Sequence, residues 1–66
     1  MRKKLIEIRK KRKLTQGEMA KLLEISRTTY TGYENGNFNP SLEKALEIKK
    51  ILKYKDDDIF LITNVG

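Results

Sequence analysis

The chain has 66 residues and a formal charge of +6, and it contains neither cysteine nor histidine. A chain of this length predicts one small domain over residues 1–66 with a limited core. The missing residue types exclude disulfides, zinc fingers and thiol or imidazole catalysis, so neither enzymatic activity nor a metal or cofactor is expected. With no apolar run long enough to cross a membrane and no signal-peptide core, a cytoplasmic location is expected.

Positive charge is concentrated at the start of the chain, where the segment 2–13 is rich in lysine and arginine and carries the single acid Glu7. Three acids, at residues 56–58, lie near the other end. A basic balance favours a polyanionic partner, either nucleic acid or an anionic membrane face, although lysine can also serve solubility alone. The charge is therefore polarised along the chain, which suits one face towards phosphate and another away from it.

The first expected helix runs from about Lys3 to Arg12, with Leu5 and Ile8 on one face. The second begins after Thr15, which can form a capping box with Glu18 three residues on. The apolar face of this second helix consists of Met19, Ala20, Leu22 and Leu23.

Ser26 is the expected N-cap of a third helix, which carries Tyr30 and Tyr33 inward at a spacing of three. We expect the Tyr30 hydroxyl at the rim of the core. The third helix ends at Asn35–Gly36, because glycine suits a left-handed stop.

A fourth helix is expected from Pro40 or Ser41 to about Leu52. Its broad apolar stripe consists of Leu42, Ala45, Leu46, Ile48, Ile51 and Leu52. The acids 56–58 predict the start of a short fifth helix over about Asp57–Leu61, because carboxylates favour a helix N-terminus. A metal site formed by the three acids is the weaker interpretation, since three successive residues of a helix point in different directions. Ile59–Thr63 is the only segment that could instead form a strand. Five short helices with brief connections therefore predict an all-α domain.

The second and third helices, over about residues 15–36, form a helix-turn-helix, in which one helix can enter the DNA major groove while the other braces it. Residues in order along the chain resemble the signature of the Cro and phage-repressor (XRE-type) helix-turn-helix family. They are Leu5, Ile8, Arg9, Leu14, Thr15, Gln16, Ser26, Arg27, Glu34, Asn35, Gly36, Asn39, Pro40, Ser41, Leu42, Glu43, Asp57, Asp58, Ile59 and Phe60. The resemblance implies a compact five-helix, lambda-repressor-like DNA-binding domain that works as a homodimer on a palindromic operator.

The same resemblance implies roles for single residues. Base contacts would come from the third helix, over about residues 27–34: Arg27, Thr28, Thr31 and Gly32. Phosphate contacts are expected from Thr15, Gln16, Asn35, Asn37 and Lys10. Arg9 and Glu34 match a pair that the family often buries as an ion pair between the first helix and the end of the third.

Each contact has a structural alternative. Arginine can bond guanine through two hydrogen bonds, and threonine can bond a base or touch the methyl group of thymine. Arg27 can equally be a solvated side chain, the threonines can serve backbone capping, and Gln16 can be an ordinary helix residue. Tyr30 and Tyr33 fit core packing better than single-strand stacking, whereas the role of Phe38, in a loop, is left open.

The chain departs from the family at turns where relatives often have glycine, namely at Lys13, Glu24 and Lys53. A positive φ at a residue with a Cβ costs roughly 1 kcal/mol, so these turns are tolerable. Gly32 removes a side chain from the groove-facing side of the third helix, which shifts specificity towards Arg27 and its threonine neighbours.

The sequence thus predicts a sequence-specific regulator of transcription that binds double-stranded DNA as a dimeric repressor. Phe60, Leu61 and Ile62, in an apolar tail over about residues 59–66, are the expected dimer interface. One alternative is a protein-interaction module of the same fold, such as an antitoxin-like partner or an antirepressor. Another is a nonspecific nucleic-acid binder, with an affinity indifferent to sequence and steeply dependent on salt.

Overall fold

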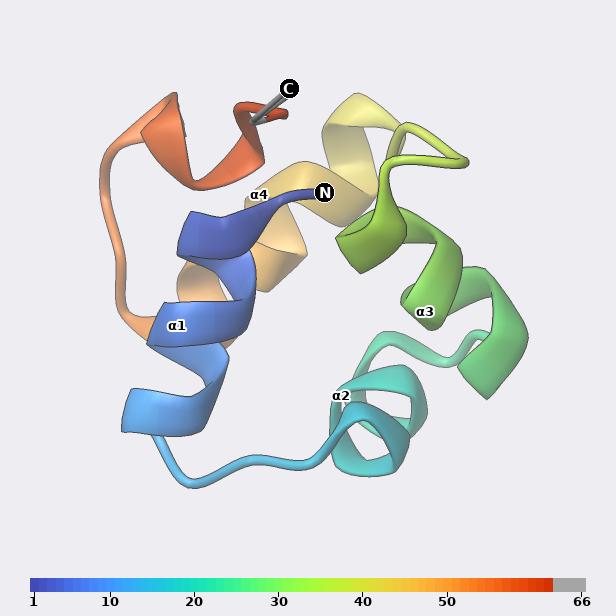
Figure 1. Cartoon of the computed structure of the whole chain (residues 1–66). Helices are drawn as coiled ribbons and strands as arrows, with labels where there is room; N and C mark the ends of the chain where they lie inside the picture. The colour runs from blue at the N-terminus through green and yellow to red at the C-terminus, as the bar shows by residue number, and fades with distance from the viewer. Residues whose placement is uncertain (63–66) are drawn as a thin grey trace.

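Four α-helices and one 3-10 helix follow one another in the computed structural model, which describes residues 1–62 (Figure 1). They are α1 (Lys3–Lys11), α2 (Gln16–Leu23), α3 (Arg27–Asn35), α4 (Leu42–Leu52) and η1 (Asp57–Phe60). Residues 1–62 contain no strand, which confirms the all-α class. No helix in this part of the chain is long and apolar enough to cross a membrane.

The short fifth helix expected over about Asp57–Leu61 is present as η1, but it is a single 3-10 turn of four residues, so the count of five α-helices is not confirmed. Its last bond runs from the N–H of Leu61 to the carbonyl of Asp58 at 3.1 Å, the i to i+3 pattern of the tighter helix. A segment this short is held by its buried residue, Ile59, rather than by its own hydrogen bonds. Residues 63–66 of the expected apolar tail, which include Val65, lie outside the described residues.

Side-chain caps fix where α2, α3 and α4 begin. The Thr15 hydroxyl accepts from the N–H of Glu18 at 3.0 Å, and the Glu18 carboxylate accepts from the N–H of Thr15 at 2.9 Å. Ser26 caps α3 and Ser41 caps α4 in the same way, each accepting from the backbone N–H three residues on. Such caps contribute about 1 kcal/mol each, so the sequence sets these three helix starts locally.

Residues in the left-handed backbone conformation, with positive φ, lie at the ends of the helices. Glu24 (φ 57°), Lys53 (φ 54°) and Gly36 (φ 85°) are the C-caps of α2, α4 and α3, and Lys13 (φ 59°) follows α1. The three residues with a Cβ adopt this conformation at a cost of roughly 1 kcal/mol each.

Apolar residues from all five helical elements meet in one core. They are Leu5, Ile8, Met19, Ala20, Leu23, Tyr30, Tyr33, Ile48, Leu52 and Ile59. Helices α2 and α3 pack against each other, α4 packs on α2, and η1 lies along α1 (Figure 1).

The apolar faces expected on α2 and α4 are broader than the faces that are buried. Leu22, Leu42 and Leu46 are exposed. Leu46 precedes the buried Ile48 by two residues, which places it on the opposite side of α4. A short helix in a small domain buries one narrow face, so these leucines fall outside it.

Arg2 is an unexpected buried anchor at the start of the chain, 3% exposed. In the sequence it is one of the basic residues of segment 2–13, but its guanidinium donates four hydrogen bonds to oxygen atoms of distant segments. The acceptors are the carbonyls of Tyr33 (2.6 Å), Phe38 (2.9 Å) and Phe60 (2.9 Å) and the side-chain oxygen of Asn39 (2.6 Å). Arg2 therefore ties the N-terminus to the end of α3, to the α3–α4 loop and to η1.

Candidate nucleic-acid interface

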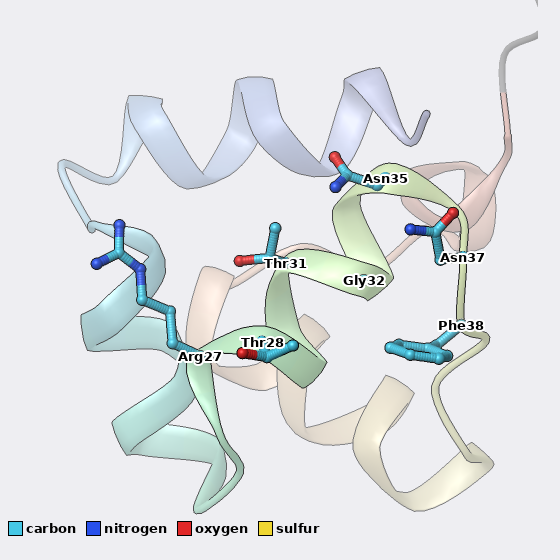
Figure 2. Close-up of a pocket in the computed structure, with 7 residues that line it drawn as sticks. All are labelled: Arg27, Thr28, Thr31, Gly32, Asn35, Asn37 and Phe38. Atoms are coloured by element: carbon cyan, nitrogen blue, oxygen red, sulfur yellow. The ribbon is translucent and has the colours of Figure 1, made fainter.

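One side of α3 and the loop that follows it line a concave surface that encloses a volume of about 410 Å³ (Figure 2). It is lined by Arg27, Thr28, Thr31, Gly32, Asn35, Asn37 and Phe38. The structure thus brings together the four residues expected to contact bases and two of those expected to contact phosphate, and it adds Phe38. We call this surface the α3 groove.

Helical spacing explains how the α3 groove is built. Thr28 and Gly32 are four residues apart and form one ridge of α3, while Arg27, Thr31 and Asn35 repeat the same spacing on the neighbouring ridge. Because Ser26 is the N-cap, Arg27 and Thr28 occupy the first turn, and both are exposed.

The other expected phosphate contacts lie outside the α3 groove. Thr15 is exposed at the N-cap of α2, and Lys10 is exposed on α1. Gln16 begins α2, and its amide nitrogen donates to Oε1 of Glu34 at 2.9 Å. One hydrogen of this amide is therefore used inside the protein, which leaves the second hydrogen and the carbonyl oxygen for another partner.

A buried ion pair fixes α3 against α1. Nε of Arg9 lies 2.6 Å from Oε2 of Glu34, and the side chain of Glu34 is 1% exposed. Arg9 also donates to the carbonyl of Leu14 at 2.8 Å, which joins the α1–α2 turn to the same network. This network joins α3 to α1 and to the α1–α2 turn and leaves the outer side of α3 open.

Tyr30 completes this network, and the expectation that its hydroxyl lies at the rim is wrong. Tyr30 is fully buried, and its hydroxyl donates to Oε2 of Glu34 at 2.6 Å. A buried carboxylate supplies the acceptor that water would supply at the rim. Burial, followed by the hydrogen bond to Glu34 and its negative charge, raises the pKa of Tyr30 above its ordinary value.

The basic N-terminal region divides into structural and exposed residues. Arg2 and Arg9 are buried in the networks described above, and Nε of Arg12 donates to the carbonyl of Leu52 at 2.8 Å, at the end of α4. Lys10, Lys11 and Lys13 are exposed. Arg12 is exposed as well, so exposed positive charge in this region comes from these lysines and from Arg12.

Gly32 is required by a neighbour from the loop. A Cβ at position 32 would overlap the Phe38 ring, lying 3.1 Å from its Cγ and closer still to Cδ2 and Cε2. The N–H groups of Asn37 and Phe38 both donate to the carbonyl of Gly32, at 2.9 and 3.2 Å. This role of Phe38 was not predicted from the sequence, where the available signal was a glycine inside a helix with an aromatic residue six positions later.

The residues expected at a dimer interface differ in exposure. Phe60 is half-buried against the core, whereas Leu61 and Ile62 are 65% and 45% exposed. The two exposed side chains follow η1 directly, and their contact with a second subunit stays a prediction.

Comparison with known proteins gives one consistent result. A family model described as helix-turn-helix matches residues 5–59. An uncharacterised HTH-type transcriptional regulator of Archaeoglobus fulgidus is 39% identical over 61 residues, which cover 92% of this chain and 86% of that protein. The HTH-type regulator MJ0272 of Methanocaldococcus jannaschii is 41% identical over 61 residues, 92% of either chain. The HTH-type regulator YqaE of Bacillus subtilis is 44% identical over 48 residues, 73% of this chain and 41% of that protein. No solved structure matches the chain.

Proposed function

The chain belongs to the XRE-type helix-turn-helix family of DNA-binding transcriptional regulators, and we propose that it is a sequence-specific dimeric repressor of a palindromic operator. The observation that supports this proposal most is the α3 groove, where Arg27, Thr28 and Thr31 gather on one open side of a helix whose other side is locked by a buried ion pair. Rigid positioning of exposed polar groups favours base recognition, because little freedom remains to be lost on binding.

In the proposed complex, α3 lies in the major groove. The guanidinium of Arg27 donates two hydrogen bonds to O6 and N7 of a guanine, an interaction that contributes about 1–3 kcal/mol of discrimination. Thr28 and Thr31 contact neighbouring base edges, whereas Gly32, which is buried beneath the Phe38 ring, makes no base contact of its own. These contacts supply specificity.

Phosphate contacts position α3 in this proposal. They come from the start of α2, at Thr15 and Gln16, from Asn35 and Asn37 beside the α3 groove, and from Lys10 on α1. Hydrogen bonds and positive charge at these points give an affinity that falls with salt.

A second copy of the chain completes the proposed repressor. Contact through Phe60, Leu61 and Ile62 relates two α3 helices by a two-fold axis, and such helices read half-sites about 34 Å apart, one turn of DNA. A dimer bound over a promoter excludes polymerase, which gives repression.

Selection of random duplex DNA on the purified protein, at a physiological ionic strength of about 0.15 M, tests the proposal. We expect a two-fold symmetric motif with half-sites about one helical turn apart. Binding without an enriched motif would indicate a nonspecific nucleic-acid binder, and absence of binding would favour the protein-interaction module.

Substitutions then test the residue roles on the selected duplex. Arg27→Ala should weaken binding by about 5- to 150-fold, the equivalent of one lost bidentate pair. Lys55→Ala is the matched control, because it also removes one positive charge from an exposed site, in the α4–η1 connection on the far side of α1 from α3 (Figure 1). Equal effects of the two substitutions would show that Arg27 contributes only charge.

A further inference from the structure

We propose that Phe38 is a specificity-determining residue whose ring contacts the 5-methyl group of a thymine in the major groove. The inference rests on the proposed function and extends it to a loop residue outside the recognition helix.

The Phe38 ring occupies the place of a missing side chain. It packs against α3 where Gly32 leaves the surface open, on the ridge that also carries Thr28 (Figure 2). Phe38 thereby supplies to the α3 groove an apolar group that position 32 itself does not provide. The ring shares this surface with Arg27 and Thr31, the side chains proposed to read bases.

The ring is exposed on one side and fixed on the other. Phe38 is 51% exposed, although one side of the ring lies against Gly32. Its carbonyl accepts from Arg2 at 2.9 Å, and its N–H donates to the carbonyl of Gly32 at 3.2 Å. Arg2 also holds the next residue through the Asn39 side chain at 2.6 Å. A side chain set on a clamped backbone loses little freedom when it meets a ligand, which favours a recognition role.

The chemistry of the ring selects its ligand. A phenyl ring offers no hydrogen bond to a base edge, and the apolar group that the major groove displays is the thymine methyl. Glycine inside a helix is intrinsically unfavourable, and here it admits a half-exposed phenylalanine rather than a buried one. A purely structural plug would gain more from full burial, so the open face of the ring points to a ligand.

Replacement of single thymines by deoxyuridine tests this inference, because it removes only the methyl group. The full chain and its selected duplex are used, with one thymine replaced at a time. When the thymine that Phe38 contacts in a half-site is replaced, the unsubstituted protein should bind about fourfold more weakly. This is the effect of losing the burial of one methyl group. Phe38→Ala should bind the unmodified duplex more weakly and should not respond to replacement at that thymine.

Two further variants keep the test decisive. Leu46→Ala truncates a side chain of similar exposure, 54%, on α4, and it should keep the response to deoxyuridine. Gly32→Ala/Phe38→Ala fills the vacated space with a methyl group, and it should fold and also lack the response.

Three results would overturn the inference. If Phe38→Ala responds to every replacement as the unsubstituted protein does, another residue reads the methyl group. If no thymine responds, the ring contacts no methyl group, and any loss of affinity in Phe38→Ala reflects a sugar contact or loop packing. If the first selection enriches no motif, the proposed function fails and this inference fails with it, whereas the other two results leave the proposed function intact.

Discussion

Glu34 joins three helices through one carboxylate, and its removal should reveal how strongly α3 is held. Glu34→Ala leaves the guanidinium of Arg9, the hydroxyl of Tyr30 and the amide of Gln16 without their common acceptor. The side chain of Arg9 is 9% exposed, so water replaces the carboxylate poorly.

The expected loss is a large fraction of the stability. Removing one partner of a buried ion pair costs about 3–5 kcal/mol. A chain of 66 residues is expected to have a free energy of unfolding of about 3–10 kcal/mol. Arg9→Leu/Glu34→Leu removes both charges, so it should cost about 1.5–3 kcal/mol less than the sum of the costs of Arg9→Leu and Glu34→Leu measured singly.

Urea unfolding followed by far-ultraviolet circular dichroism measures these free energies. The control is Asp57→Ala, which breaks the Lys49–Asp57 pair at the same N–O distance, 2.6 Å, but with the Asp57 side chain 85% exposed. An exposed pair should contribute no more than about 1 kcal/mol. Additivity of the Arg9 and Glu34 substitutions within about 0.5 kcal/mol would refute the reasoning, because it would show two independent residues.

Gly32→Ala should destabilise the protein by about 1–3 kcal/mol, since the methyl group meets the Phe38 ring, but in a Phe38→Ala background it should stabilise by about 0.5–1 kcal/mol. Chemical denaturation of the four variants measures this, and the same sign in both backgrounds would contradict it. Arg2→Lys should cost about 2–4 kcal/mol, because an ammonium group cannot reproduce the guanidinium's bonds to four separate oxygen atoms; an unchanged thermal midpoint would count against that assignment. Tyr30 has a higher pKa in the native state than its unfolded value near 10. Its contribution to the free energy of unfolding is therefore complete below pH 10 and is lost as the pH rises further, by up to about 1.4 kcal/mol per pH unit. Tyr30→Phe should lack this part of the slope in urea unfolding at alkaline pH, and equal slopes would exclude an effect of Tyr30.

Signals that lie close together in the sequence predict most of the fold. Each of the three caps acts within three residues: the capping box of Thr15 and Glu18, and the caps at Ser26 and Ser41. The starts of α2, α3 and α4 can therefore be predicted from the sequence. The all-α class follows from them, and the comparisons confirm the helix-turn-helix family to which the sequence resemblance pointed.

Features that depend on residues far apart in the chain cannot be predicted from the sequence in this way. The acceptors of Arg2 lie 31–58 residues away and are mostly main-chain carbonyls, which no side-chain pattern announces. The buried hydroxyl of Tyr30 depends on a carboxylate whose burial is itself a tertiary result. Phe38 belongs to the α3 groove only because the loop folds back over Gly32, so its place there required the structure.

The anchor at Arg2 also bears on the order in which the molecule is completed during synthesis. Residue 2 leaves the ribosome well before one of its acceptors, the carbonyl of Phe60, which is 58 residues further along the chain. Until that acceptor emerges, α1 lacks the cover of η1, and the guanidinium that holds the α3–α4 loop lacks part of its site. Such a distant contact forms late, because the intervening chain has to be ordered first. A nascent chain that already contains every residue of the α3 groove is therefore expected to reach its final shape only when synthesis has passed η1.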